Sequence, residues 1–336
     1  NPNKKRVKNI CYIKNFNQSK QMTNKRIQKI LITSIGGDIA QAIAKILTKE
    51  RPDIQLIGTD ANERNAGKFF VKKFIKVPYA KEYNYLKSIE EIISKESIDL
   101  FIPISEYEIR ESLKFNDEIA SKTIHVGEKI IKIGLDKLET YKELRNLGLE
   151  LPWTIDADKD TPHEFPCIFK NRSSSGSKSI LQANSIEESN LFREMYSGYV
   201  FQELLSPVDQ EITCGVYRTK QCKTHVIQIH RELTQGQTSW GKIIADPSIK
   251  NLCEEIAEFL NLFGSINIQL INTDKGPKIF EINPRFSSTV LMRHLVGFQD
   301  LIWTINEYED SPVDYKKPEP GIMMHKIHDV IIQENV

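Results

Sequence analysis

Short apolar runs alternate with amphipathic stretches through the first third of the chain. Lys29–Ser34, Ile54–Asp60 and Leu100–Ile104 are apolar and short enough for buried strands. Between them, apolar residues recur at helical spacing over Ile39–Leu47 and Leu86–Lys95. Strands and helices that alternate in this way are typical of a parallel sheet with right-handed crossovers. The pattern therefore predicts an N-terminal α/β domain.

Beyond this region strands become more frequent than helices. A helix is expected over Asp136–Gly148, because its apolar stripe ends at a glycine suited to a helix C-terminus. The strand-like Pro166–Lys170 then leads into a serine-rich loop over 171–179, after which Ile180 and Leu181 resume a strand. This order predicts a hairpin whose tip can close over a ligand. Further strands are expected at Tyr199–Leu205, Glu211–Tyr217, His225–His230, Ile266–Ile271 and Ile322–His328, with a helix at Cys253–Leu262.

The stretch Ile279–Arg285 combines an apolar strand with polar chemistry. Glu281 and Asn283 alternate with Ile279, Phe280 and Ile282, so their two oxygen-bearing side chains are expected to face the same way. Hard cations such as Mg²⁺ take oxygen ligands of this kind. An edge strand with its polar face in water is the alternative. The turn at 272–277 predicts a hairpin that brings Gln269 beside Glu281.

Three cations surround the serine-rich loop. Lys170, Arg172 and Lys178, together with the backbone N–H groups of the loop, suit phosphate oxygens. The G-x-x-x-x-G-K-[ST] pattern of a Walker loop is absent. A surface hairpin without a ligand is the alternative. Lys137, in the first turn of the expected helix and off its apolar stripe, would by default be an ordinary solvated lysine.

The first strand is followed by Ser-Ile-Gly-Gly-Asp, which lacks the G-x-G-x-x-G fingerprint of a dinucleotide fold. Asp38 is expected to cap the next helix. Asp60 and Glu106 follow the second and third strands. Ligands of open α/β sheets bind beyond the carboxyl ends of the strands, so Glu106 is a candidate for the cleft.

Composition limits the classes of function. Of 336 residues, 40% are hydrophobic and 27% charged, and the net charge is +1. This balance gives no indication of nucleic-acid or membrane binding, and no apolar run of about 18 residues predicts a membrane span. The odd number of cysteines, five, without C-x-x-C spacing makes a disulfide framework or zinc site unexpected and favours the cytoplasm. The basic first 26 residues are interpreted as a loose leader.

The order of these elements resembles the ATP-grasp superfamily, in particular the ATP-grasp domains of the carbamoyl-phosphate synthetase large subunit and of biotin carboxylase. The resemblance extends over roughly residues 27 to 300. The pieces that carry it are Asp136-Lys137 with the following helix, Phe169–Lys178, Gln202-Glu203, Glu211, Gln269, and Phe280-Glu-Ile-Asn-Pro-Arg285. It implies a parallel-sheet pre-ATP-grasp domain followed by a two-subdomain ATP-grasp fold with a mobile lid. The expected boundaries are 1–26 for the leader, 27–125, and 126–336 with the lid at about 152–205.

The resemblance also implies roles for individual residues. Lys137, Lys170 and the loop that includes Arg172 would contact the nucleotide's phosphates, and Arg285 and Lys170 would act in catalysis. The expected ATP-binding residues are Lys137, Lys170, Arg172, Ser174, Ser175, Gly176, Ser177, Gln202, Glu203, Leu204 and Glu211. The expected ligands of Mg²⁺ or Mn²⁺ are Gln269, Glu281 and Asn283. Arg231, Glu106 and Arg285 are the substrate candidates, although Arg231 could equally form a salt bridge with Glu232 or Glu211.

The reaction implied is that of an ATP-dependent carboxylate–amine ligase. An acyl phosphate would form and an amine would then displace phosphate, joining an amino acid to another amino acid or to an amino sugar. Two alternatives stay open: a bicarbonate-activating carboxylase or carbamoyl-phosphate-type enzyme, and a non-catalytic ATP-binding regulator. The chain is too short for a whole carbamoyl-phosphate synthetase, and the biotin carboxylase's further carboxylation residues are not recognisable. The expected partners are small-molecule carboxylates and amines, and a homodimer stays open.

Overall fold

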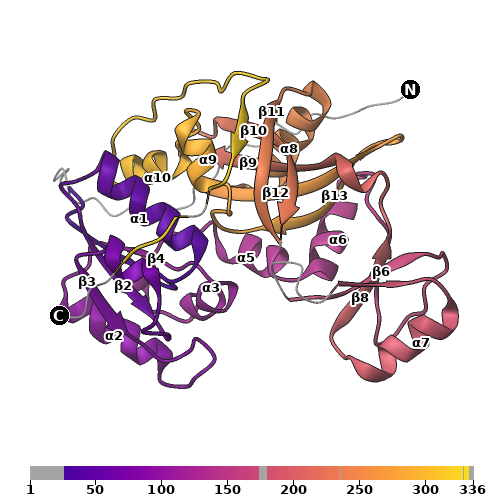
Figure 1. Ribbon diagram of the computed structural model, residues 1–336, viewed down its shortest axis with the longest axis horizontal. Coiled ribbons are helices and arrows are strands. Elements are labelled where there is room, and N and C mark those ends of the chain that lie inside the picture. Colours follow the sequence, from indigo (N-terminus) through magenta and orange to yellow (C-terminus); the bar gives the residue numbers. More distant parts are fainter. Residues whose placement is uncertain (1–25, 174–179, 235, 328, 333–336) are drawn as a thin grey trace.

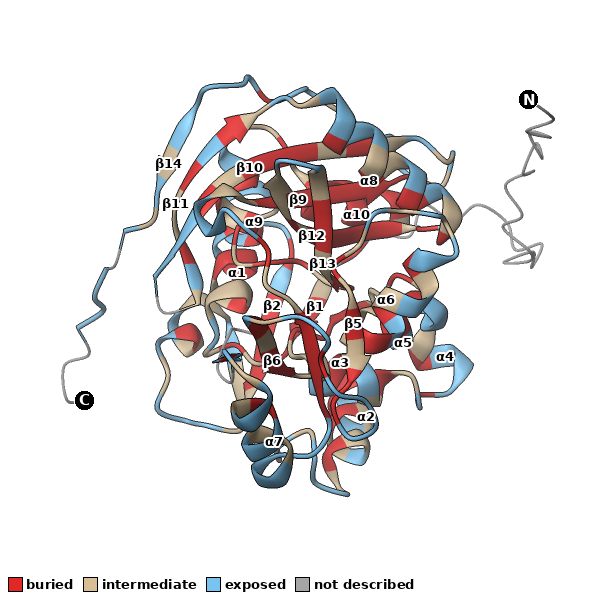
Figure 2. Cartoon of the chain, turned by 90° about the vertical axis from the view of Figure 1, so that its right-hand side faces the viewer, coloured by how far each residue is buried: buried red, intermediate tan, exposed pale blue. Residues whose placement is uncertain are grey.

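Three β-sheets organise the computed structural model (Figure 1), which describes residues 26–173, 180–234, 236–327 and 329–332. The first sheet is parallel and the other two are antiparallel. Buried residues concentrate in the strands, while the outer helix faces are exposed (Figure 2). This arrangement confirms the mixed α/β class expected from the sequence. No helix of the described chain is long and apolar enough to span a membrane.

The N-terminal parallel sheet has the strand order β3-β2-β1-β4. Its strands are β1 (Lys29–Ile32), β2 (Gln55–Asp60), β3 (Lys73–Lys76) and β4 (Leu100–Ile102), and its helices include α1 (Asp38–Glu50), α2 (Tyr85–Lys95), α3 (Glu106–Ser112) and α4 (Asp117–Ala120), with a 3₁₀ turn η1 at Ala66–Phe70. The sequence predicted three of the four strands. It missed β3 because this edge strand has no buried residue and so lacks an apolar run.

The largest sheet has six antiparallel strands in the order β13-β12-β9-β10-β11-β14. They are β9 (Glu211–Arg218), β10 (Thr224–Thr234), β11 (Gln237–Ile244), β12 (Gly264–Thr273), β13 (Gly276–Asn283) and β14 (Met323–His325), with the 3₁₀ turn η2 (Val208–Gln210) before β9. Buried residues of α5 (Glu128–Gly134), α6 (Lys137–Arg145) and α8 (Pro247–Phe259) share one hydrophobic core with β9, β12 and β13. The sequence did not predict β11, and the short β14 confirms the strand expected near 322–328.

A smaller antiparallel sheet stands apart beside α7 (Ile186–Met195), at the lower right of Figure 1. Its order is β5-β8-β6-β7, made from β5 (Thr154–Asp156), β6 (Cys167–Asn171), β7 (Ile180–Ala183) and β8 (Tyr199–Glu203). Phe169 anchors its core: its ring stacks on Tyr199 at 4.6 Å between centroids and lies 5.5 Å from that of Phe192 on α7. These strands include the hairpin expected around the serine-rich loop, so we call this unit the lid sheet.

The chain returns to the N-terminal domain after β13. Helices α9 (Val290–Leu295) and α10 (Asp300–Tyr308) contribute Val290, Leu301 and Ile305 to the core that contains the buried face of α1. Segments about 250 residues apart in the sequence therefore close one core. Helices α9 and α10 are thus part of the N-terminal domain's core, although they follow the six-stranded sheet's β13 in the sequence.

Free thiols are limited to Cys167, Cys214 and Cys253 in the described chain, and all three are buried. Cys222 is disulfide-bonded. The disulfide of Cys222 departs from the reduced state that the sequence led us to expect for the cysteines.

A buried ion pair lies where α9 and α10 meet the six-stranded sheet. The Arg293 and Asp300 side chains are 0% and 1% exposed, their closest charged atoms are 2.6 Å apart, and Ser265 donates to the same carboxylate. Gly215 of β9 makes room for the guanidinium, since a Cβ there would lie 2.9 Å from Arg293 Nη1.

Arg293→Met should lower the free energy of unfolding by about 3–5 kcal/mol, because Asp300 would be left as an uncompensated buried charge. Urea denaturation measures this change. Arg145→Met, at an exposed position of α6, is the control and should stay within about 0.5 kcal/mol of the parent. A loss below about 1 kcal/mol for Arg293→Met would show that the buried pair does not hold this junction together.

Candidate active site

A cavity of about 430 Å³ lies between the lid sheet and the six-stranded sheet. The lid sheet and the segment after it contribute Ile168, Lys170, Ile180, Gln202, Glu203, Leu204 and Leu205; the larger sheet contributes Glu211, Arg231, Gln269, Phe280, Glu281 and Asn283; Asp38 and Ile39 of α1, Lys137 of α6, and Arg285, Ser287 and Ser288 complete much of the lining. The lining thus brings together most of the site residues predicted from the sequence. They come from the lid sheet, the six-stranded sheet and the segments beside them.

The expected metal ligands lie on neighbouring strands. Gln269 on β12 is the Cα partner of Glu281 on β13, which confirms the predicted hairpin, and Asn283 lies two residues further along β13. All three line the cavity. The register shifts between Gln269 and Leu270, whose partners are Glu281 and Ile279, so Phe280 is an extra residue on β13.

The bulge corrects one expectation. Strict alternation places Phe280 on the face opposite Glu281, whereas the structure has both residues in the cavity lining. A bulge turns two successive side chains towards one face, because two residues then oppose one on the partner strand. The Lys170 ammonium lies 5.3 Å from the centroid of the Phe280 ring, so the bulge supplies a cation–π contact as well.

Lys170 is a buried cation of the site. It lies near the end of β6, its residue is 5% exposed, and it lines the cavity. Burial lowers the pKa of Lys170 to about 8; the Glu281 carboxylate partly offsets the lowering, and the Lys137 ammonium adds to it. Lys170 therefore begins to lose its proton at mildly alkaline pH, and a bound anion would favour its charged form.

Gln202, Glu203 and Leu204, three of the expected ATP-binding residues, line the cavity where the lid sheet meets the larger sheet. Gln202 is buried and donates from its amide to Thr154 Oγ1 at 2.8 Å. The Glu203 carboxylate accepts from the Lys278 ammonium at 2.7 and 2.9 Å. Because Glu203 belongs to β8 and Lys278 to β13, this ion pair bridges the two sheets. Leu204 lines the cavity next to them.

Glu211 and Arg231 form an ion pair inside the cavity, with Arg231 Nε 3.0 Å from Glu211 Oε1. Arg231 also donates to Thr238 Oγ1 at 3.2 Å. Of the two options left open by the sequence for Arg231, the structure contains the salt bridge with Glu211. Both side chains still face the cavity, so each retains access to a bound molecule.

Glu106 is not among the cavity-lining residues of the described chain. Its carboxylate instead lies 3.3 Å from Arg285 Nη2, and Arg285 also donates to the Phe286 carbonyl at 3.1 Å. The structure thus places Glu106, the first residue of α3, against Arg285, and its contact with substrate stays a prediction. Asp60 is similarly engaged, since its carboxylate accepts from the backbone N–H groups of Gly36 and Asn62.

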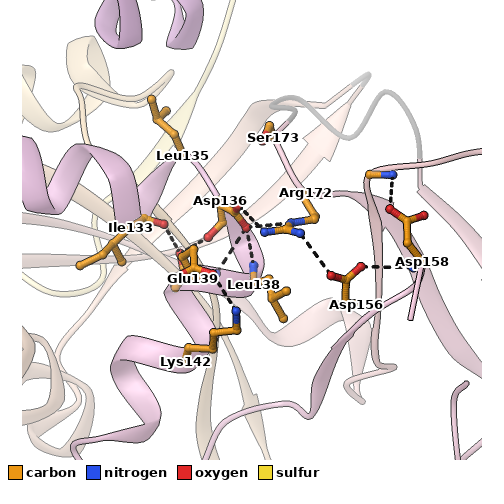
Figure 3. A network of polar contacts seen from close by, with 12 residues as sticks. Ile133, Leu135, Asp136, Leu138, Glu139, Lys142, Asp156, Asp158, Arg172 and Ser173 are labelled. Atoms are coloured by element: carbon orange, nitrogen blue, oxygen red, sulfur yellow. Dashed lines mark hydrogen bonds and ion pairs between the residues drawn. The ribbon is translucent and has the colours of Figure 1, made fainter. Parts of the chain in front are cut away.

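Arg172 also departs from its predicted place (Figure 3). It is absent from the cavity lining of the described residues; its Nη2 lies 2.7 Å from Asp136 Oδ2, and its Nη1 lies 3.4 Å from Asp156 Oδ2. Its carbonyl accepts from the Lys137 N–H at 3.1 Å. Two carboxylates attract the guanidinium away from the cavity, so Arg172 ties the start of α6 to the base of the serine-rich loop. Ser174, Ser175, Gly176 and Ser177 lie outside the described residues.

Several lining residues were not found from the sequence. Asp38 was expected to cap α1, but Gly37 is the N-cap and makes no side-chain capping bond, while Asp38 lines the cavity. Gln237, Ser287 and Ser288 also line it. The only available signal was their position, between a strand and the next helix or at a hairpin turn, which is too common to single them out.

The sequence matches two protein-family models. Residues 135–289 match the model described as an ATP-grasp domain. The chain therefore contains an ATP-grasp domain. Residues 30–126 match the model of the PylC-like N-terminal domain. No curated protein sequence matches the chain significantly.

Solved structures with the same fold include several ATP-grasp proteins. The ADP complex of an N5-carboxyaminoimidazole ribonucleotide synthetase matches with a TM-score of 0.71 at 15% identity, over 90% of this chain and 83% of that chain. The biotin carboxylase domain of the Hydrogenobacter thermophilus 2-oxoglutarate carboxylase, with MgADP and bicarbonate, matches with 0.71 at 13% identity, over 89% and 74%. The L-amino acid ligase of Bacillus licheniformis matches with 0.66 at 14% identity, over 84% and 75%. These likenesses show the fold.

ATP and Mg²⁺, the cofactors expected for an ATP-grasp enzyme, fit the side chains of the cavity. The described residues contain no group of three or more His, Cys, Asp or Glu side chains suited to a metal ion. Glu281 is the one carboxylate of the predicted set, and the amides of Gln269 and Asn283 are neutral. A site with so few protein charges suits Mg²⁺ that shares its ligands with phosphate groups. The buried Lys170 cation supplies a complementary charge for those phosphates.

The Michaelis constant for ATP should depend on pH through Lys170. A phosphate-binding lysine must be charged, so KM for ATP should be constant below pH about 8 and rise above it by about tenfold per pH unit. Initial rates between pH 7 and 9.5 measure this. Lys170→Arg is the matched control, because arginine stays charged and should give a flat profile. A flat profile for the parent enzyme would contradict the phosphate role of Lys170.

The Arg172 contacts predict non-additive effects. Asp156→Asn and Arg172→Gln should each raise KM for ATP by about three- to tenfold, because each loosens the clamp that holds the start of α6, and the double variant should be no worse than the more severe single one. Steady-state kinetics of the three variants measure this. Lys159→Gln, which removes the exposed second partner of Asp156, should leave KM unchanged. Effects of Asp156→Asn and Arg172→Gln that multiply would instead favour direct contact of Arg172 with phosphates.

Proposed function

We propose that the chain is an ATP-dependent ligase that joins a carboxylate to an amine and releases ADP and phosphate. The observation that carries this proposal is the convergence of Glu281, Asn283 and Gln269 with Lys170 and Arg285 in one cavity. Oxygen ligands for a divalent cation and fixed positive charges for phosphate oxygens are the two requirements of phosphoryl transfer.

The residues would divide the work by charge. Lys170 and Lys137 bind the phosphates, Glu281 and Asn283 hold the metal with Gln269 beside them, and Gln202, Glu203 and Leu204 receive the adenine while Glu211 faces the ribose. Bound MgATP supplies the phosphoryl group that activates the carboxylate. Arg285, positioned by Glu106, neutralises the charge that develops on the transferred group. The lid sheet excludes water, which would otherwise hydrolyse an activated acid.

The proposed reaction needs no nucleophilic side chain of the enzyme. A carboxylate oxygen takes the γ-phosphoryl group as the bond to ADP breaks, and the amine then attacks the acyl carbon, expels phosphate and loses a proton. None of the cysteines is among the lining residues of the described cavity, which agrees with a reaction that forms no covalent enzyme intermediate. Positioning and charge neutralisation therefore provide the catalysis.

The substrates we propose are an amino acid and either a second amino acid or an amino sugar. The fold shared with the Bacillus licheniformis L-amino acid ligase supports the first component. Arg231 and Arg285 add two guanidinium groups to the cavity, and guanidinium groups suit carboxylate recognition.

A bicarbonate-activating enzyme is the second candidate. The fold shared with the N5-carboxyaminoimidazole ribonucleotide synthetase and with the biotin carboxylase domain supports it. The two candidates differ in what triggers ADP release: bicarbonate alone in this case, and an organic carboxylate in the first.

ADP release should appear with one or more members of a panel of amino acids when hydroxylamine is present to trap the activated acid as a hydroxamate. Glu281→Ala should lower this rate by at least about 100-fold, because the metal loses its one charged protein ligand. Glu255→Ala, at an exposed position of α8, is the control. ADP release that depends on bicarbonate and needs no amino acid would favour the second candidate, and full activity of Glu281→Ala would contradict the metal assignment.

A further inference from the structure

A lysine from the C-terminal segment meets the rim of the cavity. Lys326 Nζ lies 3.3 Å from Asp38 Oδ2 and donates to Gln237 Oε1 at 2.7 Å. Asp38 begins α1, Gln237 begins β11, and both line the cavity. The backbone N–H of Lys326 donates to the Ser239 carbonyl at 2.8 Å, just after β14 pairs with β11. Figure 2 shows β14 at the edge of the six-stranded sheet, beside β11.

The acids of the cavity differ in where their partners come from. Glu203 pairs with Lys278, and Glu211 pairs with Arg231. In both pairs the two residues lie on different strands within the ATP-grasp domain. Asp38 instead takes the ammonium of Lys326, from the last strand-like segment of the described chain. The side chains of Asp38 and Lys326 are 30% and 26% exposed. Ion pairs at this exposure are held weakly, because water competes for both charges.

Charge is distributed unevenly along the cavity. Arg231 and Arg285 give it guanidinium groups that suit a carboxylate, whereas Asp38 and the Gln237 amide oxygen accept hydrogen bonds from a cation. The apolar side chains of Ile39 and Leu233 also line the cavity. Ile39 follows Asp38 in the sequence, and Leu233 lies near the turn of the β10–β11 hairpin. A molecule that carries both a carboxylate and an ammonium group matches this distribution.

We propose that Asp38 and Gln237 form a subsite for a primary ammonium group of the substrate, and that Lys326 occupies this subsite until the substrate displaces it. The proposal rests on the ligase function proposed above and deepens it, because it identifies the activated acid as an aminocarboxylic acid. The Lys326 side chain ends in the same –NH₃⁺ group as the proposed ligand, and its contacts show which acceptors such a group meets here.

The subsite recognises this ammonium group and does not activate it. A carboxylate next to an ammonium stabilises its charged form, and a protonated amine has no lone pair with which to attack an acyl carbon. The group bound at Asp38 therefore belongs to the acid that is activated, and the attacking amine must approach from elsewhere. The same pairing would prevent the activated acid from reacting through its own amino group.

The test compares amino acids with the hydroxy acids of the same carbon skeleton, using ADP release with hydroxylamine as the acceptor. Asp38→Asn should raise KM for the amino acid about tenfold, because one charge-assisted hydrogen bond is lost, and should leave KM for the hydroxy acid unchanged. Lys326→Gln should lower KM for the amino acid by about two- to fivefold, because the internal competitor is removed. Neither variant should change KM for ATP by more than about twofold.

Lys242→Gln is the matched control for the lysine. Lys242 is exposed on β11, and its Cα partner is Met323 of β14, two residues before His325. It is not among the residues that line the cavity. Its kinetic constants should equal those of the parent enzyme. Equal changes for amino and hydroxy acids in Asp38→Asn, or a higher amino-acid KM in Lys326→Gln, would overturn the proposal.

Calorimetry without ATP separates this proposal from the proposed function. Amino acids that bind more tightly than their hydroxy analogues, with a preference lost in Asp38→Asn, would support the subsite even if no ADP is released, and would leave only the ligase function refuted. ADP release without an amino-acid preference sensitive to Asp38 would refute the subsite alone. If the parent and Lys326→Gln enzymes neither bind amino acids nor release ADP with them, both proposals fail.

Discussion

The charge of Lys170, held almost out of water between two sheets, is the constraint on which the cavity depends. A buried ammonium is costly unless opposite charges face it, and burial lowers its pKa to about 8. Glu281 from β13 offsets part of this cost and the Phe280 ring adds a weak attraction. The remaining imbalance favours an anionic ligand. The same charge therefore explains why the cavity suits phosphate groups.

Segments far apart in the chain complete the site through ion pairs. Glu106 of the N-terminal domain contacts Arg285, and Lys278 of β13 contacts Glu203 of the lid sheet. Arg172 ties the base of the serine-rich loop to the start of α6, where Lys137 lies. Each pair joins two structural units across the cavity or at its edge.

The local patterns predicted the individual strands well and the positions of charged side chains less well. Buried strands such as β1 and β9 have apolar runs that can be recognised from the sequence alone. The strands β3 and β11 lie near sheet edges and have fewer buried positions, so their apolar pattern is weaker. Arg172 was expected at the ligand because it lies in the serine-rich loop, and Glu106 because it follows a strand of the parallel sheet, but neither pattern selects the partner of a long charged side chain. Their actual partners, Asp136, Asp156 and Arg285, come from other elements.

The sequence by itself determined the order of the elements, the hairpin that pairs Gln269 with Glu281, and the ATP-grasp character of the chain. The first two features depend on periodicity and on residue types at short separation, which are local properties, and the third rests on the resemblance of the motifs and their order to that superfamily. Only the tertiary structure decided that Phe280 joins Glu281 at a bulge, that Asp38 faces the cavity instead of capping α1, and that Lys326 reaches it from the other end of the chain. Such placements result from strand register and from packing between distant segments, and no local pattern encodes them.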